Sequence, residues 1–198
     1  MVSDLKIENP NSSLREKGKR LHPHKFILWV AIGSILMMFA GLTSAYIVKS
    51  NQASWEDIKM PQIFWFSTGT ILLSSLTIQM AFRSFKQREM NRYRLLISVT
   101  AFLGIVFIIL QWMGFQQLWN NGIQFEGVVG AGQFLYVIFG LHALHVFGGA
   151  IVLIVMVAKA LFSNTKTYSS TGIEVAATYW HFVDALWIYL MVFFLWIR

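Results

Sequence analysis

Charged residues, cysteine and proline are all scarce in this chain of 198 residues. Only 13% of the residues are charged and 56% are hydrophobic, whereas an ordinary soluble domain has roughly 25% charged residues. A chain of this length cannot bury so much apolar surface away from water, so we expect lipid to be its solvent. The absence of cysteine excludes disulfides, thiolate metal sites and cysteine nucleophiles.

Five long apolar runs follow a polar N-terminal segment. We interpret residues 1–25 as a polar cytoplasmic tail without a cleavable targeting segment, because a signal peptide would have its apolar core closer to Met1. Each run can cross a hydrocarbon core of ~30 Å as a helix, the state in which backbone groups are satisfied within lipid. The sequence therefore predicts an all-α bundle of five transmembrane helices over residues 26–198. The spans are expected at Phe26–Val48, Ile63–Phe82, Leu95–Leu118, Phe134–Ala158 and Val175–Ile197.

The distribution of basic residues predicts how the bundle is oriented. Thirteen of the 16 Lys and Arg residues lie in the N-terminal segment and in the second and fourth loops. By the positive-inside rule, the N-terminus is expected in the cytoplasm and the C-terminus outside. The net charge of +7 then reflects topology and not a nucleic-acid partner.

Ionisable side chains within the spans are the first candidates for function, because one at the bilayer centre costs at least ~2.5 kcal/mol. The fourth span contains His142 and His145, the fifth contains His181 and Asp184, and Glu174 opens the fifth. Each pair is three residues apart and should share one helix face. The depths of Asp184 and His145 differ by about one helical turn, so we predict a hydrogen bond to Asp184 from another helix, with His145 as the first candidate.

Several interpretations of these five polar residues are open. A metal or heme site made of the three histidines and Asp184 is one, and proton handling is another. We favour a buried polar cluster that fixes helix packing, because small residues beside the histidines would let a partner helix approach closely. These small residues are Gly140, Ala143, Gly148, Gly149 and Ala150. We therefore expect no catalytic, cofactor-binding or metal-binding residue in this chain, and a purely structural role for the cluster.

The other polar residues of the spans are also expected to serve packing. Gln111 lies deep in the third span and should find a partner across the bundle. The hydroxyl groups of the second span are expected to bond to carbonyls of their own helix. They belong to Ser67, Thr68, Thr70, Ser74, Ser75 and Thr77.

Two sequence blocks resemble subunit III of the heme–copper terminal oxidases. Glu174–Trp187, EVAATYWHFVDALW, is similar to the WHFVD region in the last helix of that family, and Phe139–Gly149, FGLHALHVFGG, is similar to its His-x-x-His-Val segment. Met37–Val48 and Ile71–Ala81 also match in type and order, so the resemblance runs from about Leu21 to the C-terminus. Five spans imply the shorter bacterial form, which lacks the two N-terminal helices of the long form.

The resemblance implies a non-catalytic subunit of a cytochrome c oxidase that reduces dioxygen and translocates protons in the bacterial cytoplasmic (inner) membrane. Its partners would be subunits I and II, which would hold the hemes and copper, and phospholipid bound to this chain. Its work would be to stabilise subunit I and to support proton uptake. Two acidic positions common in relatives are occupied here by Ile35 and Gly114, so the roles of those carboxylates do not carry over.

Other functions are alternatives to this interpretation. A quinol oxidase subunit III and an accessory subunit of a nitric oxide reductase share the fold. A b-type cytochrome would need heme between two spans. A secondary transporter would usually show repeats and spans broken by Gly or Pro, whereas no proline lies in the expected spans and no repeat is visible.

Overall fold

The computed structural model describes residues 23–50, 60–121, 130–162 and 170–197. This part of the chain forms five α-helices: α2 (Pro23–Ser50), α3 (Ile63–Lys86), α4 (Met90–Asn120), α5 (Gly130–Phe162) and α6 (Ser170–Trp196). All five are long and apolar enough to cross a membrane, and none of the residues described is in a strand. The predicted all-α fold with five membrane-spanning helices is confirmed.

The helices extend beyond the predicted spans, mainly at the basic end of the bundle. α3 continues to Lys86, α4 begins at Met90 and α6 begins at Ser170. Apolar runs mark only the part of a helix that lies in hydrocarbon, whereas the helix itself continues into the polar interface. α2 likewise begins at Pro23, within the predicted tail, and proline is well tolerated at the first helical position. The rest of that tail, residues 1–22, lies outside the described residues.

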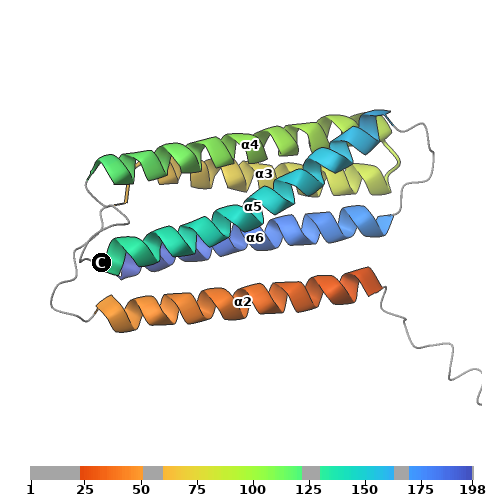
Figure 1. Cartoon of the computed structure of the whole chain (residues 1–198). Coiled ribbons are helices and arrows are strands. Elements are labelled where there is room, and N and C mark those ends of the chain that lie inside the picture. The colour runs from red at the N-terminus through yellow and green to blue at the C-terminus, as the bar shows by residue number, and fades with distance from the viewer. Residues whose placement is uncertain (1–22, 51–59, 122–129, 163–169, 198) are drawn as a thin grey trace, which may run out of the picture.

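Successive helices are antiparallel, and α3 to α6 form the body of the bundle (Figure 1). α3 and α4 make the closest pair, and α6 packs against both α3 and α5. α2 contacts α5 and α6 but neither α3 nor α4 among the described residues, and it lies at the edge of the bundle (Figure 1). The N-terminal ends of α2, α4 and α6 therefore share one end of the molecule with the C-terminal ends of α3 and α5.

Aromatic rings from four helices fill the centre of the body. Phe64, Phe107 and Phe139 each lie against Trp187, with ring centroids 5.4 to 5.8 Å apart. The four residues come from α3, α4, α5 and α6, and all four are almost completely buried. Burial of large aromatic surfaces, together with close packing, holds these helices together.

Candidate functional site: polar contacts between the helices

The five polar residues predicted as one cluster lie in separate groups. In the described part of the chain, no hydrogen bond or ion pair joins any two of them. The two α5 histidines face α2, His181 and Asp184 face α3, and Glu174 lies near the start of α6. The prediction of a single cluster is therefore corrected to three distinct sets of contacts.

The α5 histidines share a helix face, as their spacing predicts. The rings of His142 and His145 lie 6.4 and 6.0 Å from the ring of Phe39 on α2. The buried His142 ring also stacks on Trp187 at 5.3 Å, and neither of its nitrogens has a hydrogen-bond partner among the described residues. His145 Nδ1 is 2.7 Å from the Leu141 carbonyl oxygen of its own helix, so it donates there.

The predicted hydrogen bond between His145 and Asp184 is wrong. Asp184 is buried, and neither of its carboxyl oxygens has a hydrogen bond of ordinary geometry from the described residues. The hydroxyl of Ser75 on α3 is the polar group beside it. The prediction rested on depth in the bilayer, which carries no information on the rotation of a helix about its axis.

His181 joins α6 to α3 through two hydrogen bonds. Its Nδ1 is 2.6 Å from the Ser75 hydroxyl, and its Nε2 is 3.3 Å from Gln79 Oε1. A neutral imidazole with its proton on Nε2 satisfies both contacts, because it donates to the amide oxygen and accepts from the hydroxyl. Both ring nitrogens of His181 are therefore satisfied between α6 and α3 without a charge on the ring.

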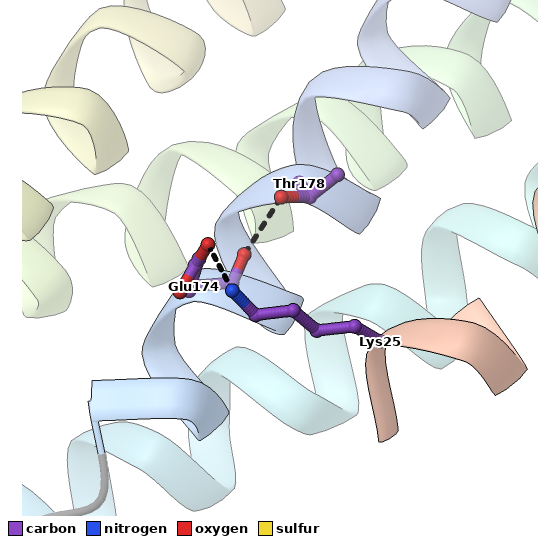
Figure 2. Close-up of polar contacts among 3 residues, drawn as sticks. All are labelled: Lys25, Glu174 and Thr178. Atoms are coloured by element: carbon purple, nitrogen blue, oxygen red, sulfur yellow. Dashed lines mark hydrogen bonds and ion pairs between the residues drawn. The ribbon is translucent and has the colours of Figure 1, made fainter. Parts of the chain in front are cut away.

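Glu174 forms an ion pair with Lys25, which joins the start of α6 to the start of α2 (Figure 2). The Lys25 Nζ to Glu174 Oε1 distance is 2.7 Å, and the two side chains are 33% and 43% exposed. Thr178 donates a hydrogen bond of 2.8 Å to the backbone carbonyl of Glu174 (Figure 2). The Thr43 and Tyr189 hydroxyls, 3.0 Å apart, make a second α2–α6 contact farther along the helices.

Two tryptophans of α6 make the contacts that the sequence analysis missed. Trp180 Nε1 donates to Ser74 Oγ at 3.1 Å, and Trp187 Nε1 donates to Thr68 Oγ1 at 3.0 Å. The signal was present, because residues seven apart share a helix face and a buried indole N–H needs an acceptor. Those acceptors are hydroxyls of α3.

The α3 hydroxyls thus serve two purposes. Bonds to carbonyls of their own helix are confirmed for Ser67, Thr68, Thr70 and Thr77. Ser74 and Ser75 instead bond to other helices, at the Thr100 carbonyl and at His181. The predicted partner of Gln111 is also confirmed, since its Nε2 donates to Ser67 Oγ at 3.3 Å.

Glycines give the Trp180 ring its space. A Cβ atom at Gly104 on α4 or at Gly149 on α5 would lie 3.0 Å from carbon atoms of that ring. The predicted close approach is therefore right for Gly149, whereas a Cβ at Gly140 or Gly148 would have nothing within 4 Å.

An apolar groove runs between α2 and α6. It has two adjoining parts of about 370 and 450 Å³, and both are bordered by Ala40 and Tyr189. The rest of its lining is mainly apolar and includes Leu36, Phe182 and Val192. Within the described ranges, no group of three or more His, Asp or Glu side chains is arranged to hold a metal ion.

Comparison with known proteins decides the family. The family model described as "Cytochrome c oxidase subunit III" matches residues 25–198. The chain belongs to this family. Cytochrome c oxidase subunit 3 of Bacillus sp. (strain PS3) is 26% identical over 91% of this chain and 86% of its own length. The probable cytochrome c oxidase subunit 3 of Mycobacterium leprae (strain TN) is 30% identical over 87% of this chain and 86% of its own length.

The subunit III family also includes longer relatives. Cytochrome c oxidase subunit 3 of Mus musculus is 32% identical over 66% of this chain but only 48% of its own length. The predicted resemblance to heme–copper oxidase subunit III is confirmed. The chain is a multi-pass membrane subunit of a cytochrome c oxidase complex.

Proposed function

We propose that this chain is a non-catalytic subunit whose work is to stabilise the catalytic subunit I of its oxidase. The observation that supports this is the use of the polar groups between the helices. Trp180, Trp187 and His181 of α6 form hydrogen bonds to hydroxyl groups of α3, and Gln111 of α4 also bonds to an α3 hydroxyl. The polar atoms of these four side chains hold helices together and are therefore not free to act on a substrate.

In this proposal the chemistry of dioxygen reduction belongs to the partner subunits. Hemes and copper are held by subunits I and II, and this chain holds neither. The structural residues are His142, His145, Glu174, His181 and Asp184, each through the separate contacts described above. Relatives from bacteria support a location in the bacterial cytoplasmic membrane. Support of proton uptake rests on the family resemblance.

The α2–α6 groove supports a role for lipid in the same function. Its lining is apolar, and several apolar side chains near it, including Met37 and Val192, are exposed in the described structure. In a membrane this surface is covered either by acyl chains or by a partner helix, because both present apolar groups to it. We assign the groove to phospholipid chains.

The test compares the oxidase with and without this chain. We expect the complex that lacks it to start with a nearly normal rate of oxygen consumption and to lose activity sooner during turnover. Trp180→Phe, which removes the hydrogen bond to Ser74, should shorten the active lifetime of the complex in the same direction. Trp112→Phe is the matched control, since Trp112 is 66% exposed on α4.

Two results would contradict the proposal. One is loss of the initial rate in a complex that still contains subunit I and its full content of heme. The other is stoichiometric heme in the purified chain, visible as a Soret band, that disappears on His142→Ala or His145→Ala.

A further inference from the structure

The turn between α3 and α4 concentrates positive charge at one end of the bundle. The segment 83–94 contains five basic residues and one acidic residue, Glu89. Glu89 pairs with Arg92 at 2.9 Å, within the first turn of α4. The other four, Arg83, Lys86, Arg88 and Arg94, are exposed and have no ion pair with any residue that the structure describes.

Backbone hydrogen bonds fix the conformation of the turn that carries these cations. The amides of Gln87, Arg88 and Glu89 donate to the last carbonyls of α3, at Arg83, Phe85 and Ser84. Arg88 has a φ of 60°, the left-handed conformation that closes many helix C-termini. α3 ends at Lys86 and α4 begins at Met90, so the turn is short, and the two helices then run side by side. The basic residues at the end of α3 and the start of α4 are therefore near one another.

Exposed apolar side chains begin directly beside these cations. Met80, Leu95 and Phe102 are each more than half exposed on α3 and α4. The Lys86 ammonium lies over the Phe82 ring, 4.4 Å from its centre, so this cation lies directly against apolar surface. The surface therefore changes from apolar to cationic within about one helical turn, as the lipid–water boundary does.

We propose that the α3–α4 turn is a binding site for the headgroup phosphate of anionic phospholipids. Four cations without an acidic partner attract an anion, and cationic clusters next to a membrane span recognise anionic lipid surfaces. The adjoining apolar surface on Met80 and Leu95 accommodates the acyl chains of the same molecule. A phosphate ion without chains would contact the cations but not this apolar surface. The site is distinct from the α2–α6 groove and does not depend on the proposed role of this chain in the oxidase.

The test measures lipid binding to the full chain by native mass spectrometry. Phosphatidylglycerol and phosphatidylcholine of equal chain length are the probes, at low and at high salt. We expect a preference for phosphatidylglycerol that weakens as salt rises, because exposed charges are screened. The triple variant Arg83→Gln, Lys86→Gln, Arg88→Gln should reduce that preference by about a hundredfold, because each cation near an anionic surface contributes roughly fivefold.

Matched variants separate the site from total charge and from folding. Lys17→Gln, Lys19→Gln and Arg20→Gln together remove the same charge from another part of the chain, and they should leave the preference within about twofold of the wild type. Arg88→Gly keeps the left-handed turn and favours its conformation, so a weaker preference in this variant cannot come from unfolding. Arg88→Lys should keep the preference, because it keeps the charge.

Three results would overturn the proposal. Equal binding of both lipids by the wild type would remove the selectivity on which it rests. An equal loss in the Lys17, Lys19 and Arg20 variant would show an effect of total charge alone. Displacement of phosphatidylglycerol by an equal concentration of inorganic phosphate would show an anion site that ignores the acyl chains.

Discussion

At the scale of single residues, Trp180 connects four helices. It belongs to α6, its indole N–H bonds to Ser74 on α3, and its ring lies against Gly104 of α4 and Gly149 of α5. Lipid tails are as apolar as the side chains of the helices, so the hydrophobic effect does not drive helices together within a membrane. Their association depends on close packing and on hydrogen bonds instead. Trp180 provides both at one position.

Two adjacent glycines of α5 test the packing around Trp180. Gly149→Ala should destabilise the chain by about 1–3 kcal/mol, because its Cβ would lie only 3.0 Å from a buried ring that the Ser74 hydrogen bond and Gly104 hold in place. Gly148→Ala should be neutral or stabilise by up to ~1 kcal/mol, since its Cβ meets open space and alanine favours the helix. Unfolding in mixed detergent micelles, followed by tryptophan fluorescence, measures both. Equal effects of the two variants would show that the ring is not confined at Gly149.

Double-mutant cycles distinguish the hydrogen bond that the structure contains from the one predicted by depth alone. For Ser75→Ala with His181→Phe, we expect a coupling energy of about 0.5–1.5 kcal/mol, because the two side chains share a hydrogen bond of 2.6 Å. For His145→Leu with Asp184→Leu, the effects should add within about 0.5 kcal/mol, because no bond joins these residues. A coupling above 1 kcal/mol in the second cycle would restore the His145–Asp184 pair.

At the scale of elements, α2 is the helix with the weakest attachment. Its most apolar stretch is 17% buried, against 28–50% for the other four helices. Its polar contacts with α6 include the Lys25–Glu174 ion pair and the Thr43–Tyr189 pair of hydroxyls, and the groove lies along the same boundary. These contacts therefore matter more for the position of α2 than their small energies suggest.

Reversing charges tests the ion pair as a clamp on α2. Lys25→Glu alone sets two like charges against each other, and it should destabilise the chain by up to ~1 kcal/mol, as expected for a partly exposed pair. The exchange Lys25→Glu with Glu174→Lys should restore most of the loss. Spin labels at Ile27 and Thr171 should report a broader α2–α6 distance distribution in the single variant and a normal one in the exchange.

The intrahelical pair in α4 is the matched control for this experiment. Arg92→Glu breaks the Glu89–Arg92 pair, which joins residues three apart, and it should leave the α2–α6 distances unchanged. If Lys25→Glu left the distances equally unchanged, the ion pair would not position α2.

What could be predicted from the sequence follows the same division of scales. Lengths of apolar sequence revealed all five spans, because lipid enforces helix over any such run. Spacing revealed which residues share a face, as His142 and His145 do against Phe39. The rotation of each helix could not be predicted, since spacing shows which residues share a face of a helix but not which neighbouring helix that face meets. The Trp180 and Trp187 acceptors and the Lys25–Glu174 pair depend on that rotation and were missed.

At the scale of the whole molecule, basic residues gather at one end of the bundle. Of the eight Lys and Arg residues in the described ranges, seven belong to the end where α2, α4 and α6 begin. They are Lys25, Arg83, Lys86, Arg88, Arg92, Arg94 and Lys159, and Lys49 is at the other end. This asymmetry supports the predicted orientation, with the basic end in the cytoplasm.

The two ends of α4 give a direct test of that orientation, and the absence of cysteine in the chain leaves no background label. Asn91 and Asn121 are exposed at opposite ends of this helix, so Asn91→Cys and Asn121→Cys should not disturb packing. We expect a membrane-impermeant maleimide to label Asn121→Cys in intact spheroplasts and Asn91→Cys only after permeabilisation. Retention of both variants in the oxidase is the control for correct insertion. Neutralising Lys49, at the other end of the bundle, should leave the labelling pattern unchanged. The reverse labelling pattern would contradict the predicted orientation and would place the α3–α4 turn and its four cations outside the cell.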